Sequence, residues 1–478
     1  MSRAVVTNPS VRNQASFRDP SGYVFHRHGR VFRAIDDCTH SVLKRLIDQG
    51  IISRLVDDQL LIDTVPVTDP QLHQKLTIEN SGYRHFLEHK LITPITYPYE
   101  WTVSMLADAG LLTIDLQIRI LEAGVSLKDA TAYNVQFVRG RPTFIDISSF
   151  EQPGRLDIWF ALGQFNQMFI FPLMLARYHG WDLRSYFLSR LNGMTVEEMA
   201  RGLGRLERWR PRSLVDITLP ALLKRLADRG DSGRRLLEQQ DPNVRSQLAN
   251  LKRVRRKIVK LAGDYKTRGL WAAYGETCTY DSAAARTKRD LVRDFIRTAQ
   301  PSRVLDLGCN TGDYSFIAAE SGASVMAVDS DHDCVETLYR RLRVTPANIT
   351  PMVIDLGNPS PAIGFLNSER DSFLQRINAD CVLGLALMHH LLVSANLSLS
   401  AIRDLLFDCT NEYLVLEFIP IDDAMFRRLM KFRVDLFEGL TLDACKNVFL
   451  NSFDLIKEAA IGNTGRTLLF LRKRTRLR

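Results

Sequence analysis

Apolar residues follow two different periods along the chain. Residues 41–237 show mostly helical spacing, whereas two stretches alternate apolar and polar positions and predict strands. The first is GYVFHRHGRVFRAI at 22–35, which predicts two strands that turn at Gly29. The second is NVQFVRGRPTFIDIS at 134–148, which predicts a hairpin that turns at Arg139-Gly140. The N-terminal half is therefore predicted to be an α+β domain.

Beyond residue 267 the pattern becomes a regular alternation of strands and helices. The predicted strands are RVLDL, SVMAVD, TPMVID, DCVLGLAL, EYLVLEFI, FDLIKEAA and RTLLFLRK. Helix-length segments separate the first five, which indicates a parallel sheet with helices on both faces. The last two follow each other closely and predict a terminal hairpin. The C-terminal half is therefore predicted to be α/β.

A polar stretch with six Lys and Arg residues between Lys252 and Lys260 separates these two regions. We interpret it as a connecting helix. This divides the chain into an N-terminal accessory domain (1–240), a basic helical linker (241–266) and a C-terminal α/β domain (267–478). A nucleic-acid-binding stripe is the alternative, but it is not favoured because most charge runs are solvated surfaces.

Composition is typical of a globular protein and adds few constraints. The 478 residues are 45% hydrophobic and 24% charged, with a net charge of +9. The uncharged run at 158–176 contains Gln164, Asn166, Gln167 and Pro172, so we expect a buried helix and no membrane span. No secretory signal is visible, and the seven cysteines form no C-x-x-C pair. A reducing, cytoplasmic location is expected.

The stretch VLDLGCNTGDYS at 304–315 carries the strongest chemical signal. Asp306 lies at the end of a predicted strand, two glycines follow, and a helix begins at once. Ligands of open α/β sheets bind at this edge, where the next strand ends in Asp329. A dinucleotide fingerprint is excluded because Asn310 and Asp313 occupy its second and third glycine positions. Asp306 and Asp313 favour a ligand with a cationic end.

These residues resemble motif I of the class I S-adenosylmethionine-dependent methyltransferases. VMAVDSD and MVIDLGNPSP resemble the second and third motifs, and DCVLGLALMHHL resembles the fourth strand with its substrate-facing loop. The resemblance implies a Rossmann-like seven-stranded methyltransferase sheet with S-adenosyl-L-methionine as the cofactor. By this resemblance, the loop with Asp306, Gly308, Asn310 and Gly312 binds the methionyl end of the cofactor. Asp329, with Ser330 and Asp331 beside it, binds the ribose. Asp355 and Leu356 flank the adenine, and Leu385 and Ala386 lie under the methionyl chain.

Candidates for the acceptor side follow the fourth and fifth strands. His389 and His390 are the candidate catalytic bases, with buried or loop-orienting roles as the alternative. Glu417 is expected either to line the pocket or to cap a turn. Tyr280 and Lys288 are candidates to close over the cofactor, although Lys288 is expected at the surface. Asp355 has a turn-forming role as its alternative.

The N-terminal half contains a second candidate site in SLKDATAYNVQFVRGRPTFID. Asp129, Asn134 and Asp146 resemble the catalytic and metal-binding residues of protein kinases and aminoglycoside phosphotransferases. The resemblance implies that Asn134 and Asp146 bind magnesium if the kinase-like domain is active; no other metal site is predicted. Leu127 replaces the usual histidine, and no glycine-rich loop or strand lysine is evident. The alternative is a recognition or docking module.

The stretches FRDPSGYVF, ITYPYEW and SLKDATAYN, placed ahead of the methyltransferase motifs, resemble a bacterial family that includes the host-specific nodulation protein NoeA of rhizobia. The resemblance implies a methyltransferase for an unidentified acceptor, a glycan or a small metabolite, with a role in host-specific nodulation. The alternatives are a non-catalytic cofactor-binding scaffold, a nucleic-acid methyltransferase and a phosphotransferase.

Overall fold

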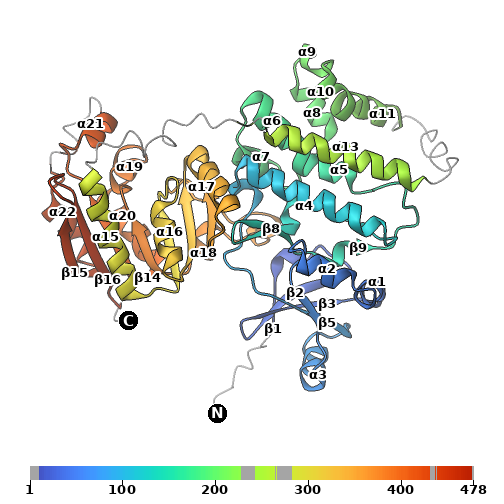
Figure 1. Cartoon of the computed structure of the whole chain (residues 1–478), viewed down its shortest axis with the longest axis horizontal. Coiled ribbons are helices and arrows are strands. Elements are labelled where there is room, and N and C mark those ends of the chain that lie inside the picture. The colour runs from blue at the N-terminus through green and yellow to red at the C-terminus, as the bar shows by residue number, and fades with distance from the viewer. Residues whose placement is uncertain are drawn as a thin grey trace.

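A computed structural model describes residues 10–227, 243–263, 265, 282–430, 437 and 439–475. Figure 1 shows the C-terminal sheet with its helices on one side of the molecule and a mixed N-terminal region on the other. Tyr280, one of the residues expected near the cofactor, lies outside the described residues.

The C-terminal sheet has the order β12-β11-β10-β13-β14-β16-β15. The first five strands in this order are parallel, whereas β16 is antiparallel to both of its neighbours. The bounds are β10 Arg303–Leu307, β11 Ser324–Asp329, β12 Ile349–Val353, β13 Ala379–Gly384, β14 Thr410–Phe418, β15 Phe453–Ala460 and β16 Thr467–Lys473. The predicted seven-stranded sheet, including its terminal hairpin, is confirmed.

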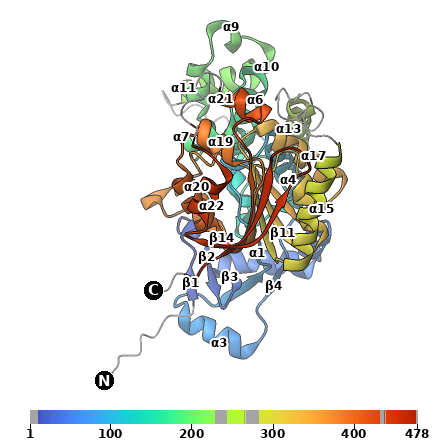
Figure 2. The same cartoon turned by 90° about the vertical axis from the view of Figure 1, so that its left-hand side faces the viewer.

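Helices cover both faces of this sheet because its strands are apolar on both sides. Val304 of β10 packs on the face covered by α15–α17, whereas Leu305 and Leu307 face α18–α22. Figure 2 shows α15 and α17 on one side of the strands and α19, α20 and α22 on the other. The helices are α15 Ser282–Ala299, α16 Asp313–Glu320, α17 His332–Val344, α18 Phe373–Arg376, α19 Met388–Val393, α20 Leu399–Cys409, α21 Ala424–Met430 and α22 Leu442–Phe449.

The N-terminal region begins with an antiparallel sheet in the order β1-β2-β3-β5-β4. Its strands are β1 Ser10–Arg12, β2 Gly22–Arg27, β3 Arg30–Ile35, β4 Thr64–Pro66 and β5 His85–His89, and its helices are α1 Asp37–Asp48, α2 Ile51–Asp57 and α3 Pro70–Glu79. The hairpin predicted at 22–35 is confirmed as β2 and β3, which pair in register from Gly22 with Ile35 to Arg27 with Arg30.

A helical part built around α4 (Val103–Leu121) follows. Two short antiparallel pairs lie beside α4: β6 (Ser126–Leu127) with β9 (Phe150–Glu151), and β7 (Val135–Val138) with β8 (Arg141–Phe144). The second pair is the hairpin predicted at 134–148. Further helices are α5 Leu162–Phe165, α6 Phe171–His179, α7 Leu183–Ser189, α8 Val196–Gly202, α9 Arg205–Arg208, α10 Pro211–Ser213 and α11 Leu219–Ala227.

Most of the uncharged run, residues 162–176, forms helix that packs into the core, as predicted, whereas residues 158–161 precede the helix. A π-helical segment, Asn166–Ile170, joins α5 to α6, and Phe169 and Leu173 are fully buried in the N-terminal core. No helix in the described part of the chain combines the length and apolar character needed to span a bilayer. Each of the six cysteines within the described ranges is free.

The basic segment forms helix α13, Val244–Gly263, which packs along α4 (Figure 1). Leu251, Val254, Ile258 and Leu261 form its buried stripe within the N-terminal core. Several of its cations bind acids of the same region: Arg255 pairs with Asp115 at 2.6 Å, and Arg253 and Lys257 pair with Asp216. We therefore propose that the domain boundary follows Gly263.

The two halves share a packed interface between α4 and α17. Tyr339 of α17 belongs to the N-terminal core, where its ring packs edge-on against Phe137 and its hydroxyl donates to Asp108 at 2.7 Å. The buried carboxylate of Glu336 accepts hydrogen bonds from the main chain and the hydroxyl of Ser104. Because α17 follows Asp329 directly, the N-terminal half supports an element that borders the predicted cofactor site.

A second set of contacts reaches the segment between β12 and β13. The guanidinium of Arg376 is buried against the carboxylate of Glu100, and Arg18 binds Glu369 at 2.5 Å. Both carboxylates are almost fully buried. Because a buried charge that loses its partner is costly, these ion pairs hold the two halves in one arrangement.

Candidate functional site

The loop after β10 adopts a backbone shape that explains its glycines. Gly308, Asn310 and Gly312 have φ angles of 72°, 49° and 88°, which lie in the left-handed region. Glycine enters this region freely, and asparagine enters it more easily than most residues. The amide of Gly308 donates to the carbonyl of Val328 at 2.9 Å, so the loop is fastened to β11.

The carboxylate of Asp329 lies against this loop, as the resemblance implies. It accepts a 2.9 Å hydrogen bond from the amide of Asn310 on one oxygen and another from the amide of Asp331 on the second. Burial raises the pKa of Asp329, against the effect of these amides. Ser330 is exposed, and Asp331 caps the N-terminus of α17. Main-chain amides therefore fix the carboxylate of Asp329 at the end of β11, and it retains acceptor capacity for a ligand.

Asp306 is buried beneath the first turn of α16. It accepts a 2.6 Å hydrogen bond from the hydroxyl of Ser315. Burial raises the pKa of Asp306 to about 6, and the nearby charge of Asp329 adds to the effect. A cationic ligand group would favour the ionised carboxylate and would lower this pKa again.

The residues assigned to the adenine and methionyl chain lie at the same edge of the sheet. Asp355 is exposed and accepts a hydrogen bond from the amide of Gly357 at 2.8 Å, so it shapes a turn after β12. Leu356 and Leu385 are buried. Ala386 has a φ of 50°, and this strained backbone lies two residues after the end of β13.

A buried charge cluster lies where β13 and β14 end. Glu417 has one oxygen 2.6 Å from Lys288 and 2.8 Å from the amide of Ala386, and its other oxygen is 3.4 Å from Arg466. Lys288 is only 4% exposed, so the expectation of a surface position was wrong. The physical reason is its partner, because burial of a lysine requires a nearby acid.

The sequence contains a partial signal for this cluster. Lys288 falls at the four-residue spacing of Ala284 and Val292, which lie on the buried face of α15. Arg466 precedes β16 without any local motif, and it also pairs with Asp423 at 2.8 Å. Neither contact is visible in the sequence, because each joins elements far apart in the chain.

The two candidate histidines lie on α19, with ring centres 4.2 Å apart. Burial lowers the pKa of His389 to about 3, so this ring is neutral, and within the described residues its Nδ1 has no hydrogen-bond partner. Burial also lowers the pKa of His390. Both rings are therefore weak bases, and His389 presents a free acceptor or donor nitrogen inside the protein.

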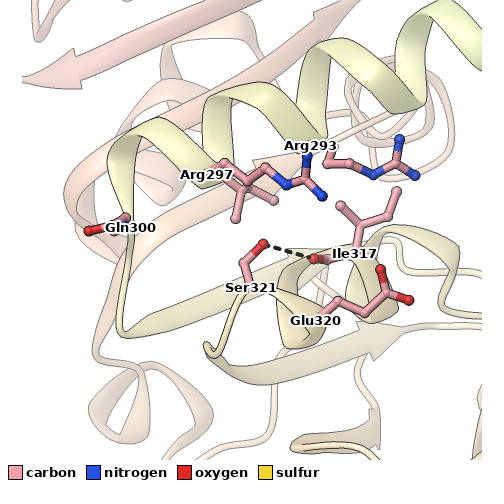
Figure 3. Close-up of a pocket in the computed structure, with 7 residues that line it drawn as sticks. Arg293, Arg297, Gln300, Ile317, Glu320 and Ser321 are labelled. Carbon is pink, nitrogen blue, oxygen red and sulfur yellow. Dashed lines mark hydrogen bonds between the residues drawn. The ribbon is translucent and has the colours of Figure 1, made fainter.

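A separate pocket of about 240 Å³ lies between α15 and α16. Figure 3 shows Arg293 and Arg297 on the upper helix facing Glu320 and Ser321. This pocket is at the C-terminal end of α16, about 12 Å from the glycine loop at its N-terminal end. It is therefore distinct from the predicted cofactor site.

Gly312 provides a direct test of the loop geometry. A Cβ on Gly312 would lie 2.4 Å from Cδ1 of Leu338, a fully buried side chain of α17. We expect Gly312→Ala to lower the free energy of unfolding by about 3 kcal/mol, as the sum of left-handed strain and overpacking.

Gly322→Ala is the matched control for this substitution. Gly322 has a similar φ of 95°, but a Cβ there would meet no atom within 4 Å. Urea unfolding of both variants should show a loss of only about 1 kcal/mol for Gly322→Ala. Equal losses in the two variants would contradict the close packing of the loop on α17.

The N-terminal candidates are also brought together. The side-chain amide of Asn134 donates to Asp146 at 3.3 Å, and Asp129 is half-buried nearby, with a pKa raised by burial and by the charge of Asp146. However, Arg33 of β3 lies 2.9 Å from the same carboxylate of Asp146. The residues present therefore do not fit the magnesium ion that the kinase resemblance implies.

The strand order, the antiparallel final strand pair and the glycine loop after β10 define the C-terminal sheet as a class I methyltransferase fold. No protein-family model matches the sequence. The nodulation protein NoeA of Rhizobium meliloti (strain 1021) is 32% identical over 464 residues, which cover 96% of this chain and 95% of that protein. The chain belongs to the family of the nodulation protein NoeA.

Solved methyltransferase structures also show similarity. The N-methyltransferase NodS from Bradyrhizobium japonicum WM9 is 12% identical, with a TM-score of 0.32, and the match covers 41% of this chain and 99% of NodS. Magnesium protoporphyrin IX methyltransferase (ChlM) from Synechocystis PCC 6803 is 20% identical, with a TM-score of 0.30, over 40% of this chain and 84% of ChlM.

Proposed function

We propose that this protein is an S-adenosyl-L-methionine-dependent methyltransferase whose C-terminal domain binds the cofactor at the loop after β10. The observation that carries the proposal is the position of Asp329, whose carboxylate is fixed by the amides of Asn310 and Asp331 at the edge of the glycine loop. This carboxylate suits a pair of ribose hydroxyls. Asp306 suits the cationic methionyl end.

The other predicted site residues are assigned to parts of the cofactor or to the acceptor. Asp355 and Leu356 would flank the adenine, and Leu385 would lie under the methionyl chain. When bound, the cofactor supplies an electrophilic methyl group on a sulfonium. The chain itself aligns the acceptor and excludes water. Because His389 and His390 are weak bases, we propose that they position the acceptor or receive its proton only as the methyl group is transferred.

The acceptor is proposed to be a glycan or a small metabolite, with a role in nodulation suggested by the similarity to the nodulation protein NoeA. The test is incubation of the protein with methyl-labelled cofactor and separate small-molecule, oligosaccharide and nucleic-acid fractions of a bacterial extract. Label should enter one of the first two fractions. Cofactor binding without labelled product in any fraction would favour the non-catalytic scaffold, and label in nucleic acid would contradict the proposed acceptor class.

Cofactor affinity should depend on pH through Asp306. Because the pKa of its carboxyl is about 6 in the unliganded protein, affinity for the sulfonium cation should fall below that pH, by up to about tenfold per pH unit. Asp306→Asn should bind more weakly at pH 7.5 and lose most of this dependence. Fluorescence titration from pH 5 to 8 measures both.

Acid unfolding through Asp306 would not explain a loss of cofactor affinity at low pH. A carboxyl whose pKa is raised by folding binds its proton more tightly in the folded state. Its contribution to the free energy of unfolding therefore increases as the pH falls from about 6 towards the pKa of the same carboxyl in the unfolded chain. An affinity that stays constant between pH 5 and 8 would show that Asp306 does not face the cationic group.

A further inference from the structure

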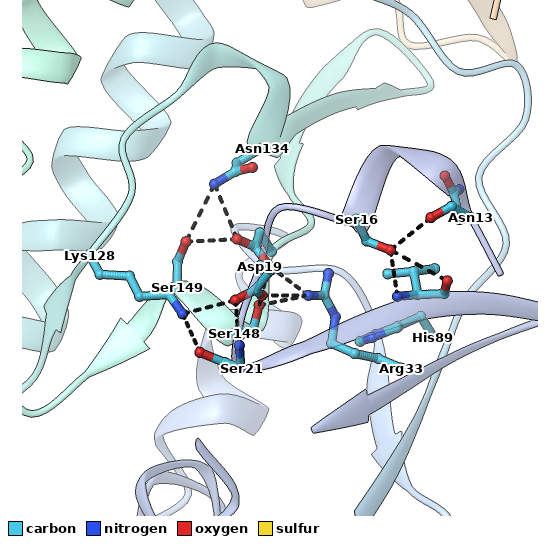
Figure 4. A network of polar contacts seen from close by, with 12 residues as sticks. Asn13, Ser16, Asp19, Ser21, Arg33, His89, Lys128, Asn134, Ser148 and Ser149 are labelled. Atoms are coloured by element: carbon cyan, nitrogen blue, oxygen red, sulfur yellow. Dashed lines mark hydrogen bonds and ion pairs between the residues drawn. The ribbon is translucent and has the colours of Figure 1, made fainter. Parts of the chain in front are cut away.

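The centre around Asp146 in the N-terminal half has the arrangement of a metal site but contains a different cation. Figure 4 shows the side chains of Asn134, Ser148 and Ser149 gathered around the carboxylates of this centre, with Arg33 and Lys128 reaching in from opposite sides. Asn134 and Asp146 come from the two ends of the β7–β8 hairpin. In kinase-like sites, an asparagine and an aspartate in such positions hold magnesium.

The guanidinium of Arg33 occupies the open side of Asp146. Its Nη1 lies 2.9 Å from Oδ1 of Asp146 and 3.8 Å from Oδ2 of Asp19, and it donates to the hydroxyl of Ser148 at 2.6 Å. Arg33 is only 6% exposed and projects from the middle of β3. A guanidinium is always charged, so this position is permanently cationic.

The other oxygen of Asp146 also has partners. Oδ2 accepts hydrogen bonds from the side-chain amide of Asn134 at 3.3 Å and from the hydroxyl of Ser149 at 2.8 Å. Arg33 pairs with Oδ1, so both oxygens of Asp146 have partners within the protein. The carboxylate is thus satisfied without any added ion.

The carboxylate of Asp19, beside Asp146, also pairs with a cation of the protein. Lys128 lies 3.2 Å from Asp19 and donates to the hydroxyl of Ser21 at 2.7 Å, and Ser148 donates to the second oxygen of Asp19. Within the described ranges, no three His, Cys, Asp or Glu side chains are arranged to hold a metal ion. A divalent ion at Asp146 would also lie within a few ångströms of a fixed positive charge, which opposes its binding.

We propose that the guanidinium of Arg33 replaces the divalent cation of this centre. The centre is a structural ion cluster that joins the segment around Asp19, β3 and the β8–β9 connection, and it does not transfer phosphoryl groups. Removal of the guanidinium should leave two carboxylates and an asparagine facing a cavity. These are oxygen ligands of the kind that Mg²⁺ and Mn²⁺ prefer. Loss of the internal cation should therefore create affinity for an external one.

The test is titration of the full chain with Mn²⁺, followed by electron paramagnetic resonance, with and without ATP. The wild-type protein should bind neither Mn²⁺ nor metal–ATP at this centre. Arg33→Ala should melt at a lower temperature, gain one Mn²⁺ site, and recover part of its melting temperature when Mn²⁺ is added. Arg33→Ala combined with Asp146→Asn should lose the new site.

Arg30→Ala is the matched control, because Arg30 lies on the same strand in an exposed pair with Glu88 and should gain no metal site. Failure of a folded Arg33→Ala variant to gain Mn²⁺ would overturn the proposal. Wild-type binding of Mn²⁺ or metal–ATP that Asp146→Asn abolishes would also overturn it. This wild-type titration decides the question even if Arg33→Ala does not fold.

Discussion

Asp329→Ala should weaken the binding of S-adenosylmethionine by about 100-fold or more. The substitution removes the acceptor that we propose for two ribose hydroxyls, each worth about 1.5 kcal/mol as a hydrogen bond to a charged group. It also leaves the amides of Asn310 and Asp331 without the carboxylate that holds them. Isothermal titration of the wild type and the variant measures the loss.

Asp380→Ala separates this effect from general damage to the sheet. Asp380 also accepts a main-chain amide hydrogen bond at a strand end, from Arg303 at 3.0 Å, but it lies at the opposite edge of the sheet. The control should retain cofactor affinity within about twofold, since it touches no proposed cofactor contact. Equal affinity losses in the two variants would mean that Asp329 acts only through stability.

Glu417→Ala should destabilise the protein by about 3–5 kcal/mol, because it leaves Lys288 and Arg466 buried without the carboxylate that neutralises them. It should also abolish methyl transfer, since Glu417 holds the amide of Ala386 in the loop that leads to His389. Urea unfolding followed by fluorescence measures the first effect, and the labelled-methyl assay measures the second.

Glu412→Ala is the control on the same strand. Glu412 pairs with Arg472 at 2.9 Å, but both side chains are largely exposed. Exposed pairs contribute little, so this variant should lose less than about 1 kcal/mol and keep its activity. If Glu417→Ala were no more destabilising than Glu412→Ala, the buried cluster would not have the energetic role assigned to it.

The sequence predicted the sheet well because its signals are local. FDLIKEAA coincides with β15, Phe453–Ala460, and RVLDL coincides with β10. Each strand has its own apolar run, and each turn has its own polar residues or glycines. The positions of Asp306 and Asp329 at strand ends follow from the same local pattern, which is why the cofactor site could be proposed from the sequence.

Contacts between distant elements could not be predicted in this way. The pairs Lys288–Glu417 and Arg33–Asp146 join residues more than a hundred positions apart, and neither partner lies in a motif that names the other. The packing of the basic helix α13 was also not predicted. Its six cations suggested a linker, whereas the spacing of Leu251, Val254, Ile258 and Leu261 corresponds to a stripe that faces the core.

The central claim is that the loop after β10 binds S-adenosylmethionine, and calorimetric titration of the full chain with S-adenosylhomocysteine tests it most directly. The wild type should bind one molecule per chain, Asp380→Ala should match it, and Asp329→Ala should show little or no heat at the same concentrations. Absence of binding by the folded wild type, or undiminished binding by Asp329→Ala, would contradict the claim.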